Sequence, residues 1–193
     1  PMNMGWLWFL PVLFLFDMFY FLVSRLNITF PLPGLKGSLI AVFVVGVAYS
    51  FLISIFKLSG WTKTILIDFQ NERLIIYLLY FLLGALCYRI KIFDKEPGSR
   101  IPYYIVCSTI WIPMNLYIIF LINLFMNPGH YIISQFTDVL LVWIGLHLTI
   151  LGMLYLLVCT FRYYINRKGV LARALGGYSY GVYIFHYVVM GVI

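Results

Sequence analysis

The stretch Gly176–Ile193 reads GGYSYGVYIFHYVVMGVI and indicates the kind of fold that the whole chain adopts. Two glycines end a basic segment, and an almost wholly apolar run that contains one histidine, His186, follows them. An ionisable side chain inside such a run is costly in a bilayer, so it is a candidate functional residue by default. The stretch therefore predicts a membrane helix with a functional group, around which the preceding apolar segments pack.

The composition of the chain is that of a polytopic membrane protein. Apolar residues make up 64% and charged residues 10% of the sequence, whereas soluble domains contain roughly 45–50% and about 25%. A length of 193 residues predicts one domain, residues 1–193. The net charge of +7 is explained by basic cytoplasmic loops, so we expect no nucleic-acid partner. The three cysteines lack ligand spacing, and we expect neither a disulfide nor a metal site.

Six segments are predicted to be membrane helices, because a crossing needs about 20 mostly apolar residues. A further segment, Leu58–Arg73, is too short and too polar to cross, and we expect it to lie at the membrane surface. The sequence thus predicts an all-α membrane protein, a polytopic transmembrane bundle with about six spans. In order, the spans are Gly5–Leu26, Gly37–Phe56, Leu74–Ile92, Tyr103–Phe125, Val139–Phe161 and a helix that begins near Gly177.

The distribution of lysine and arginine predicts the orientation of the bundle. Ten of the 13 basic residues lie in the first, third and fifth connections, which are therefore predicted to be cytoplasmic. His186 would then lie about 13 Å from the cytoplasmic end of its helix at ~1.5 Å per residue, near the middle of the bilayer. The ten residues are Arg25, Lys36, Arg89, Lys91, Lys95, Arg100, Arg162, Arg167, Lys168 and Arg173.

Several other polar residues fall inside the predicted spans. Asp17 is too far from Arg25 to pair with it along one helix, so we expect it to face the bundle, a cavity or a basic group outside this chain. For His147 we favour an interhelical hydrogen bond over a catalytic role, and Asn115 is interpreted in the same way. Arg89 ends its span, where it acts either as an interfacial anchor or as a site residue.

Three segments together resemble one known family. The segments GWLWFLPVLFLFDMFYFL (residues 5–22), YLLYFLLGALCYR (77–89) and SYGVYIFHYVV (179–189) follow one another along the chain. They are similar, in the same order, to helices of the acyltransferase 3 family of integral membrane acyltransferases. The resemblance covers nearly the whole chain, although the loops match nothing distinctive.

This resemblance implies an enzyme of about ten membrane helices in a bacterial inner membrane. Such enzymes move an acyl group, often acetyl, from acyl-CoA to a hydroxyl of a sugar or envelope glycan, and we expect no bound cofactor. The family's best-supported catalytic histidine lies in a first helix that this sequence does not contain. We therefore expect the chain to be part of a longer protein, truncated at both ends, and to be inactive alone.

The resemblance also yields candidate site residues. His186 matches the histidine of the family's last motif and is our candidate catalytic residue, since acyl transfer to a hydroxyl needs a general base that titrates near neutrality. Tyr183 lies three residues before it, on the same helix face. The candidate substrate-binding residues are Tyr183, Ser179, Arg89, Arg25 and Asp17, of which the arginines would attract the phosphates of the donor. A structural role remains the alternative for each.

Two other classes of function fit the same residues. In a transporter or flippase for an envelope lipid or sugar, Asp17, His147 and His186 would line a path, and helices broken at Pro11 and Pro113 would suit it. In a structural or sensory membrane subunit, His186 would affect the amount of protein but no acyl transfer.

Overall fold

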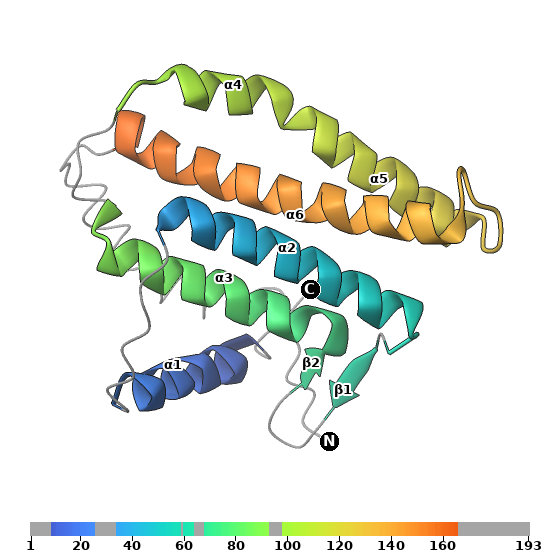
Figure 1. Ribbon diagram of the computed structural model, residues 1–193, viewed down its shortest axis with the longest axis horizontal. Coiled ribbons are helices and arrows are strands. Elements are labelled where there is room, and N and C mark those ends of the chain that lie inside the picture. Colours follow the sequence, from blue (N-terminus) through green and yellow to red (C-terminus); the bar gives the residue numbers. More distant parts are fainter. Residues whose placement is uncertain (1–8, 26–33, 59, 64–67, 93–97, 166–193) are drawn as a thin grey trace, which may run out of the picture.

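The computed structural model describes residues 9–25, 34–58, 60–63, 68–92 and 98–165, most of which are helical (Figure 1). A π-helical segment, η3 (Phe161–Ile165), continues the last helix. Two short strands, β1 (Trp61–Lys63) and β2 (Asp68–Gln70), lie between the second and third helices. The helices are α1 (Phe9–Arg25), α2 (Leu35–Ile55), α3 (Asn71–Arg89), α4 (Ile101–Thr109), α5 (Trp111–Met126) and α6 (Gln135–Thr160).

Three segments of the described chain are long and apolar enough to cross a membrane. They are Leu35–Ile55, Ile101–Met126 and Gln135–Tyr164, which match the second, fourth and fifth predicted spans. Helices α1 and α3 form where the first and third spans were predicted, but α1 has only 17 described residues, and α3 carries charged residues at both ends. The sixth predicted helix lies outside the described residues.

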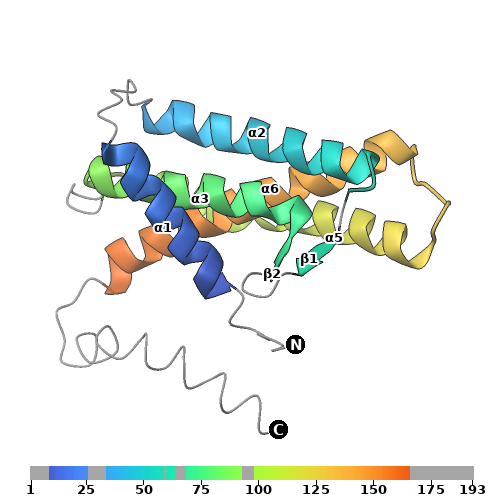
Figure 2. The ribbon, with the colours of Figure 1, turned by 90° about the horizontal axis from the view of Figure 1, so that it is seen from below.

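The long helices lie side by side and alternate in direction. Helix α6 packs between α4–α5 and α2, and α3 packs on the other side of α2 (Figure 1). Helix α1 crosses α3 obliquely (Figure 2). The rings of Phe16 and Tyr20 on α1 lie 5.9 and 6.3 Å from the ring of Phe81 on α3, centroid to centroid. This arrangement brings residues from α2, α3 and α6 together in the interior.

The outer surface of the bundle is apolar, and the buried face of α2 is lined by small residues. Ile40, Ile112 and Phe125 are 65%, 69% and 83% exposed, which would be unfavourable in water but is suitable for contact with lipid tails. In contrast, the buried residues of α2 include Ser38, Val42, Gly46, Val47 and Ser50. Small residues let membrane helices approach closely, so packing and interhelical hydrogen bonds replace the large hydrophobic core of a soluble protein.

The fourth predicted span forms a helical segment that is long and apolar enough to cross a membrane, but the segment is broken at Ile110, between α4 and α5. Pro113 has no N–H to donate to the carbonyl of Thr109, four residues earlier, and its ring crowds that carbonyl. A Cβ atom at Gly145 of α6 would lie 3.0 Å from the carbonyl oxygen of Pro113 and 2.9 Å from the backbone nitrogen of Tyr117. The kinked segment therefore packs backbone to backbone against α6, and a glycine is required at the contact.

The polar segment Leu58–Arg73 contains a small antiparallel sheet. Trp61 of β1 pairs with Gln70 of β2, and the Thr62 hydroxyl donates to Oδ1 of Asn71 at 2.6 Å. Its described residues before α3 form no helix, and its predicted position at the membrane surface stays a prediction. Among the described residues this sheet is the departure from the predicted all-α fold.

The start of α6 is held by a buried carboxylate. Asp138 is fully buried and accepts hydrogen bonds from the backbone N–H groups of Ile132 at 2.7 Å and Ile133 at 3.1 Å. The Ser134 hydroxyl caps the helix by accepting from the backbone N–H of Thr137. Carboxylates are stabilised near helix N-termini. The exposed connection before α6 is therefore tied by hydrogen bonds to the first turn of that helix.

Candidate functional site

Six of the nine basic residues of the described chain lie at one end of the bundle. Figure 1 shows the start of α2, the end of α3, the start of α4 and the end of α6 at the same side. We call this side the basic end; the described residues there include no aspartate or glutamate. The helices thus alternate as the orientation argument requires. The basic residues at this end are Arg25, Lys36, Arg89, Lys91, Arg100 and Arg162.

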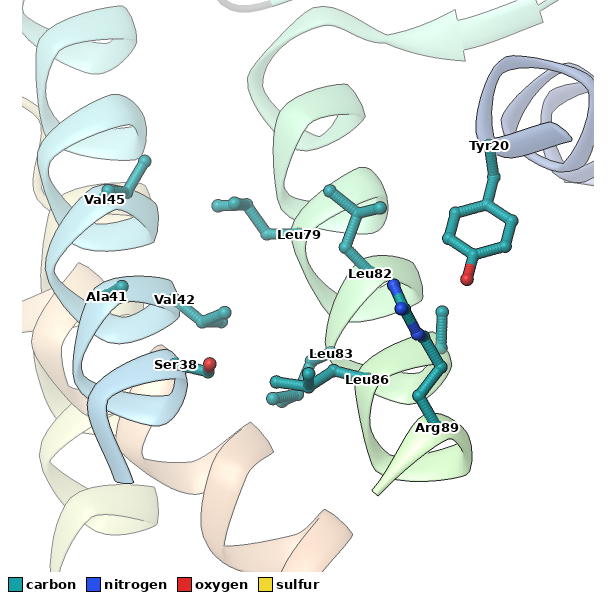
Figure 3. Close-up of a pocket in the computed structure, with 11 residues that line it drawn as sticks. Tyr20, Ser38, Ala41, Val42, Val45, Leu79, Leu82, Leu83, Leu86 and Arg89 are labelled. Atoms are coloured by element: carbon teal, nitrogen blue, oxygen red, sulfur yellow. The ribbon is translucent and has the colours of Figure 1, made fainter. Parts of the chain in front are cut away.

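A pocket of about 370 Å³ lies at the basic end between α1, α2 and α3 and is called here the Arg89 pocket. In Figure 3 the Arg89 side chain lies along α3, with its guanidinium directed toward the hydroxyl of Tyr20. Ser38 lines the same pocket from α2 and is only 7% exposed, yet its hydroxyl has no hydrogen-bond partner among the described residues. The rest of the lining is apolar. The pocket therefore combines one cation, one unsatisfied hydroxyl and hydrocarbon walls.

A larger cavity of about 730 Å³, called here the Arg162 groove, lies between α3, α4–α5 and α6. Arg162 borders it at the basic end, and Leu148 and Pro113 border it deeper in the bundle. Between Arg162 and Leu148 the groove follows α6 for about 21 Å at ~1.5 Å per residue. It is an apolar groove with a cation at its basic end, and it is open to the outside of the described bundle, since its lining residues Ile112 and Leu148 are 69% and 44% exposed.

Aromatic side chains connect the start of α4 with the end of α6 at the basic end. The Arg100 guanidinium lies over the rings of Tyr163 and Tyr164, 5.5 and 5.7 Å from their centroids. The hydroxyls of Tyr104 and Tyr164 are 3.0 Å apart, and that of Tyr103 is 3.2 Å from Oγ1 of Thr160. Cation–π contacts of this kind hold a guanidinium in place without neutralising it. The cluster therefore fixes a positive charge at this end of the bundle.

His147 lies fully buried where α2, α3 and α6 meet. Its Nδ1 is 3.2 Å from the Tyr80 hydroxyl, and its Nε2 is 3.4 Å from Oγ of Ser50. The Ser50 hydroxyl donates its hydrogen to the Gly46 carbonyl at 2.8 Å, so it can only accept from His147. Nε2 must then carry the imidazole hydrogen, and Nδ1 accepts from Tyr80.

The surroundings of His147 confirm the interhelical hydrogen bond predicted for it. Each ring nitrogen bonds to a different helix, and the ring is parallel to that of Tyr80 within 12°. A neutral imidazole with both nitrogens engaged cannot take a proton from a substrate unless a partner moves. His147 therefore joins three helices, and Tyr80 and Ser50 are the partners that sequence reasoning missed.

The chain matches a known protein family over its whole length. The sequence model of the family described as an acyltransferase domain matches residues 1–193. The chain belongs to the acyltransferase 3 family. No curated protein and no solved structure matches it significantly. Family membership thus supports a membrane acyltransferase in general, and the site has to be argued from the chain itself.

For this acyltransferase family member, the structure separates the predicted site residues. Arg89 lines a pocket. Arg25 is exposed, and its guanidinium lies 5.0 Å from the ring centroid of Phe21 on its own helix. Asp17 is exposed on α1 and has no ion-pair partner among the described residues. The role of Asp17 in substrate binding stays a prediction.

Four further residues were singled out from the sequence. His186, Tyr183 and Ser179 lie outside the described residues, so their roles stay predictions. Asn115 is exposed on α5 and forms no helix–helix hydrogen bond within the described part of the chain. The described residues contain no group of three or more histidine, cysteine, aspartate or glutamate side chains that could hold a metal ion.

Sequence reasoning also missed Arg162 as a groove residue. It was counted only as one of several loop cations, because nothing in the sequence shows which of them borders a cavity. A signal was present for Ser50. Gly46, Ser50 and Ser54 recur at intervals of four, the spacing of small residues on one face of a closely packed membrane helix.

Proposed function

We propose that this protein is an integral membrane acyltransferase of a bacterial inner membrane. It transfers an acyl group, in the simplest case acetyl, from acyl-CoA to a hydroxyl of a sugar or envelope glycan. The observation that carries the proposal is the match of the acyltransferase family over residues 1–193. The apolar helices of the described chain agree with a membrane enzyme. We also propose that residues 1–193 contain about six membrane spans.

The reaction needs a base, an electrophile and a place for the leaving group. The acceptor hydroxyl oxygen attacks the thioester carbonyl carbon, the carbon–sulfur bond breaks, and the hydroxyl proton finally protonates the CoA thiolate. A histidine that titrates near neutrality is suited to carry that proton. His186 is the candidate for this role, whereas His147 is excluded as the resting-state base by its bonds to Tyr80 and Ser50.

We infer that the acyl donor uses the Arg162 groove. Acyl-CoA combines several phosphates with a long, narrow arm that ends in the acyl thioester. Arginine binds phosphate with charge-assisted hydrogen bonds, and Arg162 borders the groove at its basic end. The Arg162 groove follows α6 for about 21 Å at ~1.5 Å per residue, which is long enough to hold the arm. We also propose that Arg25 and Arg89, which lie at the basic end too, attract the anionic donor through their positive charge.

Radiolabelled acetyl-CoA provides the test of the reaction. Membranes that contain the complete protein, of which residues 1–193 are a part, are incubated with the label, and glycans and lipids are extracted and fractionated. Label in a glycan fraction, lost on His186→Ala at unchanged protein level, is the expected result. If protein is present and neither acetyl-CoA nor a longer acyl-CoA transfers label, the proposal fails and transport of an envelope lipid or sugar becomes the better reading. We expect residues 1–193 expressed alone to be inactive.

The placement of the donor has a separate test. Arg162→Gln should raise the KM for acyl-CoA about tenfold, the effect of losing one hydrogen bond between charged groups. Arg73→Gln is the matched control, because Arg73 is exposed at the start of α3, at the opposite end of the bundle. Equal KM values for the two variants would refute binding of the donor in the Arg162 groove, but they would not contradict the proposed acyl-transfer reaction.

A further inference from the structure

The Arg89 pocket has features that the transfer reaction does not require. Its walls are hydrocarbon apart from Arg89, Ser38 and Tyr20. Val45 and Leu82 line the pocket and are also 46% and 36% exposed. The pocket is therefore open to the outside of the described bundle. We take this open, apolar side to contact lipid, so that a ligand would enter the pocket sideways from the bilayer.

We propose that the Arg89 pocket binds an anionic phospholipid from the leaflet at the basic end of the bundle. The guanidinium would hold the lipid phosphate, and one acyl chain would lie against the leucines and valines between α2 and α3 (Figure 3). Basic pockets between membrane helices on the cytoplasmic side are suited to anionic head groups. The proposal goes beyond acyl transfer, because the lipid is neither donor nor acceptor.

The buried hydroxyl of Ser38 is the second observation that points to a ligand. A buried polar group without a partner is unfavourable, and native proteins rarely leave one unsatisfied. Ser38 lies in the first turn of α2, close to the basic end, and borders the same pocket as Arg89. The ester carbonyls of a phospholipid lie just below its phosphate. Such a carbonyl would accept the hydrogen of the Ser38 hydroxyl.

The depth of the pocket agrees with a single leaflet. From Arg89 at the end of α3 to Leu79, the deepest lining residue on that helix, the distance is about 15 Å at ~1.5 Å per residue. The hydrocarbon core of a bilayer is about 30 Å thick, so the pocket extends from the head-group level to the middle. An acyl chain anchored at Arg89 would therefore fill it along its length.

Charge at this end supports an anionic rather than a zwitterionic lipid. Lys36 follows the first residue of α2, and Arg25 ends α1, so both lie at the same end as Arg89. One cation near the surface contributes about 1 kcal/mol to binding of anionic lipid. Loss of Arg89 should therefore remove about a fivefold preference.

Native mass spectrometry of the purified full chain tests the proposal. The probes are dioleoyl phosphatidylglycerol and dioleoyl phosphatidylcholine, which differ only in the head group. The wild-type protein should retain one phosphatidylglycerol, with about fivefold preference over phosphatidylcholine. Arg89→Gln should abolish the preference, while Ser38→Ala should weaken retention of both lipids. Arg73→Gln, at the opposite end, should behave like the wild type.

Two further arms keep the proposal falsifiable. Ala41→Phe adds a side chain that fills the pocket without a change of charge, so it should lower retention of both lipids. This variant still tests the proposal if Arg89→Gln or Ser38→Ala folds poorly. Equal retention of the two lipids by the wild type, or an unchanged preference in Arg89→Gln, would overturn the proposal. Displacement of the lipid by acyl-CoA would also overturn it, because the pocket would then belong to the donor.

Discussion

Gly46→Ala is expected to destabilise the bundle strongly, because Gly46 lies directly against the His147 ring. A Cβ atom at Gly46 would be 2.5 Å from Cε1 and 2.9 Å from Nδ1 of that ring. The ring cannot turn away without losing its bonds to Tyr80 and Ser50. Overpacking costs about 1–3 kcal/mol, and each interhelical hydrogen bond in a membrane contributes about 0.6 kcal/mol. The expected loss is therefore about 2–4 kcal/mol.

Reversible unfolding in mixed micelles with increasing SDS measures this loss. Tryptophan fluorescence reports on the interface, because the Trp143 indole N–H of α6 donates to Oγ of Ser54 on α2 at 2.9 Å. Gly84→Ala is the matched control, since a Cβ atom at Gly84 within α3 would have no neighbour within 4 Å. Alanine there should be neutral or stabilising by up to about 1 kcal/mol, because glycine weakens a helix interior.

A double-mutant cycle decides whether the His147 ring is the cause. In a His147→Ala background the clash disappears, so Gly46→Ala should cost less than about 1 kcal/mol. If Gly46→Ala costs the same with and without the imidazole ring, the two residues are not coupled. The proposed three-helix contact would then be refuted.

Three other substitutions test separate parts of the chain. Tyr80→Phe removes only the hydroxyl that donates to His147, and the same SDS titration should show a loss of about 0.6 kcal/mol; no loss would contradict the assigned hydrogen bond. Asp138→Ala leaves the N–H groups of Ile132 and Ile133 without their acceptor, and should cost about 1–3 kcal/mol and speed proteolysis before α6. In the complete protein, His186→Ala should lower acyl transfer more than abundance, and equal losses of activity and folded protein would make His186 structural.

The positions of the helices were largely predictable from the sequence. The second span was predicted as Gly37–Phe56 and forms as Leu35–Ile55, and the fifth was predicted as Val139–Phe161 and forms as Gln135–Thr160. The agreement follows from one requirement, since a backbone in hydrocarbon must bond to itself and an apolar run therefore becomes a helix. The boundaries fall where polar residues or glycine begin.

The partners of buried polar groups were not predictable in the same way. The hydrogen bond of His147 was expected, but Tyr80 and Ser50 lie 67 and 97 residues away in the sequence. Asp138 directly precedes the predicted fifth span, and its full burial in the first turn of α6 was not predicted. Such contacts depend on which helix faces meet, and periodicity is weak in helices that are apolar on every side.

The sequence by itself determined that this is a membrane protein of the acyltransferase 3 family, with helices at defined positions and basic residues at alternate connections. These properties depend on local composition and motifs, which each segment carries alone. Only the tertiary structure decided that His147 joins three helices, that Arg89 and Arg162 border two different cavities, and that the Ser38 hydroxyl is left unsatisfied. Pockets and hydrogen bonds between helices arise from packing, because they need side chains that are brought together from distant parts of the chain.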